Sequence, residues 1–313
     1  ICIPTLNRVE FLKISLQGLL PEAQAAGVEV CVSDNASSDG TSEFLRELSS
    51  QYSCLKVRRS EMKLDIDSSM LAAIAMGSGE YIYPLGDDDC LESGGLLALL
   101  SYLERSEDAV VLNGWHTGPQ LQKKHVHLGA ELAGKVYHRP NEAFESLWDR
   151  MPFGSFLARR SLFERSSAGD YSGTSHAYTG VVWDNLARQF ASTGRCVVSC
   201  MPDPVVMLRG AEKTWKAEAA DILLFQIGEW FWRVAQQPIY RRAVLSAMDA
   251  YARVYLKSSK LMRYKVVGQL DWRGANRLMR IWPKRKMVII GTMLTPRFLQ
   301  KPYLKRRGIS LQD

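Results

Sequence analysis

Short apolar runs alternate with longer segments of helical spacing over the first 115 residues of the chain. Five apolar runs predict strands, at residues 1–4, 28–33, 55–58, 80–85 and 109–113. Four segments place apolar side chains three or four positions apart and predict helices, at residues 10–20, 42–49, 67–77 and 94–104. Strands that are apolar throughout and separated by helices are typical of a parallel sheet covered on both faces. We therefore predict an α/β fold with a mostly parallel sheet flanked by helices.

The pattern changes after residue 115 and again near residue 211. Residues 116–210 are mixed, with strands predicted at 123–128 and 196–200 and helices at 141–149 and 181–190. From residue 217 onward, large apolar side chains recur with helical spacing, which predicts a helical extension. We therefore predict three segments, at residues 1–115, 116–210 and 211–313.

Charge is distributed unevenly along the chain. The net charge is +7, but residues 233–313 contain 19 Lys or Arg and three acidic residues, so this segment carries +16 and the remainder carries −9. Such asymmetry predicts an electrostatic partner for the basic segment, either nucleic acid or an anionic membrane surface. A composition of 46% hydrophobic and 23% charged residues is typical of globular proteins and excludes a chain that is disordered throughout.

The cysteines and the apolar runs bear on the compartment. Six cysteines are scattered without a disulfide framework, which favours a reducing, cytoplasmic compartment. No apolar run approaches the roughly 20 residues of a membrane-spanning helix. The sequence begins at Ile1, inside an apolar run, so we expect a few residues to precede it.

Three consecutive carboxylates, Asp87, Asp88 and Asp89, follow the strand predicted at 80–85. Ligands bind at the carboxyl ends of strands in parallel α/β sheets. Carboxylates and substrate phosphates are the oxygen ligands that Mg²⁺ and Mn²⁺ prefer. The triplet therefore predicts a site for a divalent cation and a diphosphate, with a solvated acidic turn at the start of the next helix as the alternative.

Two other predicted strands end in polar loops. Pro4, Thr5, Asn7 and Arg8 leave the first strand and supply a hydroxyl, an amide and a guanidinium, which suit a nucleoside and its phosphates. Asp34 leaves the second strand, where a carboxylate can recognise a ribose or a base edge. Ordinary turn formation is the alternative for each loop alone. Three such loops at one sheet edge favour a nucleotide site.

Three segments resemble the signatures of family 2 inverting glycosyltransferases with the GT-A fold. They are ICIPTLNR at residues 1–8, VSDNASSDGT at 32–41 and GEYIYPLGDDD at 79–89. The resemblance is strong over residues 1–115 and looser to about residue 210. It implies a Rossmann-like sheet with a nucleotide-sugar-binding half at 1–115 and an acceptor-binding half at 116–210, followed by the basic helical extension.

The resemblance also implies roles for individual residues. The first segment contacts the nucleotide, Asp34 binds the nucleoside, and an Asp-x-Asp motif holds a divalent metal, Mg²⁺ or Mn²⁺, on the diphosphate. Gly86 replaces the first Asp of the commoner Leu-Asp-x-Asp-Asp pattern, which leaves Asp88 and Asp89 as the metal ligands. The implied donor-binding residues are Pro4, Thr5, Asn7, Arg8, Asp34, Asp67, Asp87 and Asp88. The family's pattern is not kept at Lys63, Asp65 and Ser69, before the helix predicted at 67–77.

Inversion by a single in-line displacement at the anomeric carbon requires a base for the acceptor hydroxyl. The family supplies it from a Glu-Asp pair that opens a helix. Asp184 matches the Asp of that pair, and Trp183 stands in the place of the Glu. An ordinary acid at a helix N-terminus is the alternative, and the upstream motifs favour the catalytic role.

Residues 173–178 resemble, more narrowly, abequosyltransferase-like enzymes of O-antigen assembly. Their polar and aromatic side chains predict an acceptor site that includes His176 and Tyr178, with a loop stabilised by its own hydrogen bonds as the alternative. Arg209, Lys213 and Trp215 lie where the family has a mobile segment over the donor. A cation there could steady the leaving diphosphate, although an ordinary surface loop explains it as well.

Two histidines, His125 and His127, share one face of the strand predicted at 123–128. No nearby Cys or acid completes a metal-ligand set, so we interpret them as structural.

These features together predict a metal-dependent inverting glycosyltransferase that moves a hexosyl or deoxyhexosyl group from a nucleotide sugar to a saccharide acceptor. A nucleotidyltransferase is the alternative enzyme, but no glycine-rich loop with a trailing Lys or Arg follows the first strand. A nucleic-acid-binding protein would leave the acidic triplet unexplained, so we expect no nucleic acid partner.

The basic segment also carries aromatic residues and the cluster Lys284, Arg285 and Lys286 beside an apolar stretch at 287–294. Basic and aromatic side chains attach proteins to anionic membrane surfaces. We therefore expect peripheral attachment to the inner face of the cell membrane, where a lipid-linked acceptor would lie. A helical cap whose Lys and Arg only solvate its outer face is the alternative.

Overall fold

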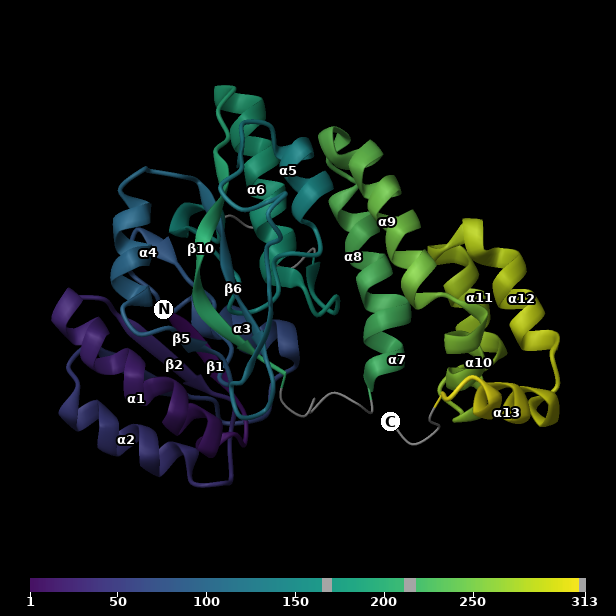
Figure 1. Cartoon of the computed structure of the whole chain (residues 1–313), viewed down its shortest axis with the longest axis horizontal. Coiled ribbons are helices and arrows are strands. Elements are labelled where there is room, and N and C mark those ends of the chain that lie inside the picture. The colour runs from purple at the N-terminus through teal and green to yellow at the C-terminus, as the bar shows by residue number, and fades with distance from the viewer. Residues whose placement is uncertain (165–170, 211–217, 310–313) are drawn as a thin grey trace. The chain divides into compact units, whose positions relative to one another are not determined.

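The structure, a computed structural model, describes residues 1–164, 171–210 and 218–309 (Figure 1). The chain divides into two compact units. The first contains residues 1–172 and 177–212, and the second contains residues 173–176 and 213–313.

A parallel three-stranded sheet opens the first unit. Its strands β1 (Cys2–Thr5), β2 (Val30–Asp34) and β3 (Leu55–Arg59) lie side by side in chain order. The helices α1 (Val9–Ala26), α2 (Thr41–Gln51) and α3 (Ile66–Ile74) follow these strands in turn. The predicted strands and helices of this region are confirmed, except that α1 continues past Pro21 to a left-handed cap at Gly27.

A second, seven-stranded sheet completes the first unit. Its strands are β4 (Tyr81–Ile82), β5 (Cys90–Leu91), β6 (Ala109–Thr117), β7 (Lys123–Val126), β8 (Val136–Tyr137), β9 (Phe156–Arg159) and β10 (Val198–Arg209). Only β6 and β10 pair in parallel here, and the other pairs are antiparallel. The strands β4 and β7 lie within the strands predicted at 80–85 and 123–128. The strands β5, β8 and β9 are not predicted, because each spans only two to four residues, too few to show a period.

Three further helices belong to the first unit: α4 (Gly95–Leu103), α5 (Pro140–Leu147) and α6 (Ala177–Thr193). The two sheets meet through β1, because the N–H of Cys2 donates to Tyr83 O at 2.8 Å and the N–H of Leu85 donates to Cys2 O at 3.0 Å. Apolar residues of α1, including Leu12 and Leu16, pack with β2 and with the second sheet in one core. This continuous core fixes the loops that follow the strands.

The second unit is helical, as predicted for the C-terminal segment. Its helices are α7 (Ala219–Asp221), α8 (Ile227–Val234), α9 (Arg241–Tyr255), α10 (Ser258–Val266), α11 (Trp272–Ile281), α12 (Lys286–Leu294) and α13 (Arg297–Arg306). Aromatic rings form its centre: Trp282 stacks on Tyr251 with ring centroids 5.5 Å apart, and its indole N–H donates to Leu224 O at 2.8 Å.

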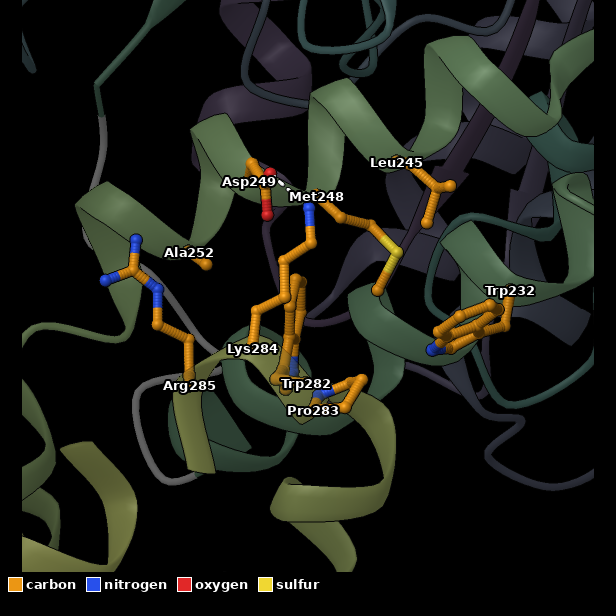
Figure 2. A pocket seen from close by; sticks show the side chains of 9 residues that line it. All are labelled: Trp232, Leu245, Met248, Asp249, Ala252, Trp282, Pro283, Lys284 and Arg285. Atoms are coloured by element: carbon orange, nitrogen blue, oxygen red, sulfur yellow. Dashed lines mark hydrogen bonds and ion pairs between the residues drawn. The ribbon is translucent and has the colours of Figure 1, made fainter. Parts of the chain in front are cut away.

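A shallow pocket lies in the second unit beside Trp282 (Figure 2). It is lined by side chains of α8, α9 and residues 282–285, and an ion pair joins Lys284 to Asp249 along its rim, with Nζ and Oδ2 2.6 Å apart. Over the described parts of the chain, none of the helices combines the length and apolar character that a bilayer crossing requires.

Candidate active site

The first two predicted nucleotide loops lie together at the carboxyl edge of the parallel sheet. In the strand register Thr5 is opposite Asp34, and Asp34 is opposite Arg59. The acidic turn reaches the same edge, because the hydroxyl of Thr5 donates to Asp87 Oδ2 at 2.9 Å. The predicted convergence of these three loops is therefore present in the structure.

Asp34 is fully buried and has several partners inside the protein. Its Oδ1 accepts the N–H of Ser37 at 2.9 Å, and its Oδ2 accepts the hydroxyl of Ser42 and Nη1 of Arg59 at 2.5 and 2.7 Å. Burial alone raises the pKa of Asp34, but the hydrogen bonds from the two serines and the charge of Arg59 outweigh it, so the pKa is lowered. Asp34 is thus a negatively charged carboxylate at the end of β2, and its hydrogen bonds fix the loop that follows.

Asn7 ties the loop after β1 to the loop after β2. Its backbone has a φ of 54°, its N–H donates to Ser37 Oγ at 2.9 Å, and its Oδ1 accepts the N–H of Ser38 at 2.7 Å. Pro4 lies beside Ser33 in the last part of β1. The loop that carries Arg8 is therefore held in one conformation by its neighbours.

Arg8 bridges two carboxylates of the acidic turn. Its Nη2 lies 2.5 Å from Asp88 Oδ2, and its Nε lies 3.2 Å from Asp87 Oδ1. Burial raises the pKa of Asp87 to about 7, although the Arg8 charge opposes this rise. The guanidinium therefore offsets part of the repulsion between the crowded carboxylates.

Gly86 lies close against the other two carboxylates. A Cβ at this position would lie 2.7 Å from Asp89 Oδ2 and 3.2 Å from Asp88 Oδ1, so both oxygens border the volume that a side chain would fill. Gly86 thus has a steric role: a side chain at this position would force the Asp89 carboxylate to move. Asp89 is 6% exposed, and its Oδ1 accepts the N–H of Arg209 at 2.8 Å. Burial raises its pKa well above the usual range, and the neighbouring Asp88 adds to the rise.

The two carboxylates beside Gly86 suit the predicted metal by their chemistry. Mg²⁺ and Mn²⁺ take one or two protein carboxylates and complete their shell with water and phosphate oxygens. Asp88 Oδ1 and Asp89 Oδ2 supply that number of carboxylates at Gly86. Across residues 1–164, 171–210 and 218–309, the structure holds no group of three or more His, Cys, Asp and Glu side chains placed to bind a metal. A cation here would thus depend on oxygens from a bound diphosphate.

Two guanidinium groups lie against one aromatic ring next to the acidic turn. The Cζ of Arg8 lies 4.6 Å from the ring centroid of Phe11, and the Cζ of Arg209 lies 5.2 Å from it. Arg209 is 8% exposed, and its Nη2 lies 3.8 Å from Cys90 Sγ. Sequence reasoning did not single out Phe11, whose only signal is its spacing of three residues from Arg8 at the start of α1.

Asp67 and Asp184 are both connected with α6. Asp67 is buried, and its Oδ1 accepts the N–H of Ala177 at 2.9 Å, so it joins α3 to the first residue of α6. Asp184 is 5% exposed and bonds Arg188 one turn later, with Nε and Oδ2 2.9 Å apart. Because α6 begins at Ala177 rather than near residue 181, Asp184 lies about two turns inside the helix and does not open it.

Trp183, in the place of the family's Glu, is fully buried. Its ring meets that of Phe144 edge-on, with the centroids 5.2 Å apart. This side chain therefore has a packing role in the first unit.

The residues predicted for acceptor binding belong to different parts of the structure. Tyr178 is buried in the first unit, where its ring stacks on Phe153 at 4.6 Å and its hydroxyl donates to Met151 O at 3.2 Å. His176 belongs to the second unit, with its ring 6.1 Å from that of Trp230. Lys213 and Trp215 lie outside the described residues. The placement of Tyr178 favours a packing role, and acceptor contact remains a prediction.

The histidines of β6 and the following segment form a stacked cluster. His116 lies 4.7 Å from His125 between ring centroids, and its Nε2 lies 3.0 Å from His127 Nδ1. The other ring nitrogen of His127 lies 2.9 Å from Arg150 O. Burial, with the neighbouring histidines, lowers the pKa of His116 to about 4, and burial lowers that of His127. Neutral, mutually bonded rings agree with the structural interpretation.

Known proteins resemble this chain in sequence and in fold. The family described as Glycosyl transferase family 2 matches residues 1–166. Abequosyltransferase RfbV of Salmonella typhimurium (strain LT2) is 34% identical over 239 residues, which cover 71% of this chain and 70% of the relative.

Two solved structures share its architecture at low identity. TarS 1–349 of S. aureus, in complex with UDP-GlcNAc, has a TM-score of 0.60 and 13% identity and covers 98% of this chain and 90% of its own. The mannosyltransferase PcManGT from Pyrobaculum calidifontis, in complex with GDP-Man and Mn²⁺, has a TM-score of 0.51 and 15% identity over 93% of this chain and 84% of its own. The predicted fold class is confirmed.

Proposed function

Because the chain belongs to glycosyl transferase family 2, we propose that it transfers a sugar, with inversion, from a nucleotide-sugar donor to a saccharide acceptor in a metal-dependent reaction. The observation that carries this proposal is the pair of carboxylates beside Gly86, Asp88 and Asp89, at the sheet edge that also holds Thr5 and Arg8. Oxygen ligands, a hydroxyl and a guanidinium meet there, as a nucleoside diphosphate and a divalent cation require.

The donor would lie along the carboxyl edge of β1 and β2. Thr5, Asn7, Arg8 and the backbone at Pro4 border that edge, and the Asp34 carboxylate fixes the loop beside it. We assign the nucleoside to this edge. Asp67 would support the site from beneath, through its bond to Ala177.

The diphosphate would lie next to the acidic turn. Asp88 and Asp89 would hold Mg²⁺ or Mn²⁺, which supplies positive charge to the leaving diphosphate. Asp87 keeps Thr5 and Arg8 in place. Arg209 and Arg8, which both lie beside the Phe11 ring, would add two guanidinium groups near the phosphates.

Asp184 is the proposed base for the acceptor hydroxyl. Its position matches the acid of the family's motif, and its bond to Arg188 fixes the orientation of the carboxylate. A positioned base of this kind typically contributes about 10²–10⁴-fold to the rate.

The relative named an abequosyltransferase supports a hexosyl or deoxyhexosyl donor and an acceptor in O-antigen assembly. We propose that the acceptor is lipid-linked and that the enzyme works in the cytoplasm, at the inner face of the cell membrane. The surplus of Lys and Arg in residues 233–313 supports attachment to an anionic surface.

Isothermal titration with UDP, GDP, CDP and dTDP, with and without Mn²⁺, tests the donor and metal assignments together. We expect one of the nucleotides to bind in the presence of Mn²⁺. Its affinity should be at least about tenfold lower in the presence of a chelator. Asp88→Asn should remove this metal dependence, whereas Asp203→Asn, at an exposed position of β10, should keep it. Equal binding with chelator, or an unchanged Asp88→Asn protein, would refute the metal site.

A further inference from the structure

Helix α13 follows α12 directly, and the two helices meet at a corner (Figure 1). We give the name apolar corner to the side chains of Leu294, Phe298 and Leu299. Leu294, Phe298 and Leu299 are 68%, 72% and 54% exposed. Apolar residues clustered in this way on a surface, rather than scattered singly, mark interaction sites.

Buried polar contacts hold the corner in place. The Nζ of Lys265 donates to the carbonyl oxygens of Thr292, Met293 and Thr295 at 3.2, 2.7 and 2.6 Å. Gln300 is fully buried, and its Nε2 donates to Thr292 O at 2.8 Å and to Thr295 O at 3.0 Å. The carbonyls of Thr292 and Met293 in the last turn of α12, which a helix end leaves without backbone partners, are thus satisfied by side chains.

A corner fixed in this way presents its apolar residues in one arrangement. Binding through it therefore requires little further ordering of the chain, which favours association. The contacts of Lys265 and Gln300 stabilise the backbone turn between α12 and α13. The apolar side chains on the outside of this turn do not pack in the core.

Positive charge surrounds the apolar corner. Residues 286–309 contain six Lys or Arg and no Asp or Glu. Arg297, Lys301 and Lys305 are exposed and lie four residues apart, so they follow one side of α13. None of these three forms an ion pair with a residue that the structure describes, whereas Lys284 is paired with Asp249 (Figure 2).

We propose that the apolar corner inserts into the interface of an anionic lipid bilayer while Arg297, Lys301 and Lys305 contact the headgroups. Apolar and aromatic side chains with adjacent cations are the pattern of interfacial membrane segments. Nucleic acid would use the cations but leave Leu294, Phe298 and Leu299 in water. This inference rests on the membrane location proposed above. It places the attachment site at the apolar corner instead of at residues 284–286.

Co-sedimentation of the full chain with vesicles tests the inference. Vesicles of phosphatidylglycerol and phosphatidylcholine are compared with vesicles of phosphatidylcholine alone. In the corner variant, Leu294→Ser, Phe298→Ser and Leu299→Ser are combined. The matched control combines Met62→Ser and Leu97→Ser, whose side chains are 71% and 58% exposed in the first unit.

The corner variant should bind the anionic vesicles about tenfold or more weakly than the parent, and the control should bind within twofold of it. Replacing Arg297, Lys301 and Lys305 by Gln should remove the preference for anionic lipid and its salt dependence. Lys284→Gln should have a smaller effect, because Asp249 already neutralises that ammonium.

Unchanged vesicle binding by the corner variant would overturn the inference. So would a change from dimer to monomer in that variant with vesicle binding retained, which would make the corner an interface between copies of the chain. Transfer to a lipid-linked saccharide dissolved in detergent, without vesicles, is measured on the same proteins. A parent that binds vesicles through the corner but transfers no sugar would refute the proposed activity and leave the membrane surface standing.

Discussion

Arg8 Nη2 lies 2.5 Å from Asp88 Oδ2, so a guanidinium of the chain already neutralises a carboxylate that we assign to metal binding. The same side chain reaches Asp87 with its Nε at 3.2 Å. Arg8 therefore has two effects on ligand binding. It competes with a metal ion for Asp88, and it attracts the diphosphate. These effects can be separated by substitution.

Replacing Arg8 by Gln should change metal and nucleotide affinity in opposite directions. Without the guanidinium, Asp88 is free for Mn²⁺, so binding of the ion alone should tighten by a few-fold. The nucleoside diphosphate loses a charge-assisted bond, and its affinity in the presence of Mn²⁺ should fall about tenfold. Titrations of Mn²⁺ alone and of nucleotide with Mn²⁺ measure both values. Parallel weakening of the two would show that Arg8 only maintains the acidic turn.

The substitution Gly86→Ala tests whether metal binding depends on the positions of the carboxylates of Asp88 and Asp89 beside Gly86. The new Cβ would lie 2.7 Å from Asp89 Oδ2, so the carboxylate must move. We expect metal-dependent nucleotide binding and transfer to fall at least about tenfold while the midpoint of thermal unfolding changes by a few degrees at most.

Gly18→Ala is the matched control for this substitution. Gly18 lies inside α1 with no atom within 4 Å of its Cβ position, so Ala should stabilise the helix by roughly 0.5–1 kcal/mol and leave transfer unchanged. Full activity of Gly86→Ala would contradict the metal assignment at this position.

The sequence predicts the first part of the fold and its loops well because the signals there are local. The apolar residues of β1 and β2 indicate burial on both faces, and the polar residues that end these strands, Thr5 and Asp34, then lie at one edge by topology alone. The antiparallel strand β9 and the antiparallel partners of β10 have no such signal, because two to four apolar residues fit a helix as well as a strand.

Side-chain contacts between distant segments are beyond the sequence pattern. The bond from Ala177 to Asp67 spans 110 residues, and the contacts of Arg8 and Arg209 with Phe11 depend on the assembled sheet. The steric role of Gly86 likewise appears only once Asp89 is placed, although the departure from the motif is visible in the sequence.

Asp184→Asn should lower kcat for transfer by about 10²–10⁴-fold and leave donor affinity within a few-fold, because a base faces the acceptor. Asp184 is also buried and bonded to Arg188, which would fit a structural role, and this alternative is tested in parallel. Arg188→Gln removes the same ion pair but keeps the carboxylate. Equal losses of thermal stability and of activity in the two variants would make the pair structural and exclude Asp184 as the base.

The stability of the first unit should fall in mild acid because of the histidine cluster. Burial lowers the pKa of His116 from 6.5 to about 4, so the unfolded chain binds more protons between these values. The free energy of unfolding therefore contains a contribution that is present above pH 6.5 and is lost as the pH falls toward 4. A pKa shift of this size corresponds to a loss of at most about 3 kcal/mol in the free energy of unfolding. Because the His116 ring is half-exposed and solvent screens its charge, we expect a loss of about 1–2 kcal/mol. Urea unfolding at pH 7, 6 and 5 measures it, and His116→Asn should flatten the decline while His138→Asn, at an exposed position, should not. Identical slopes in the parent and in His116→Asn would mean that another group takes up the proton.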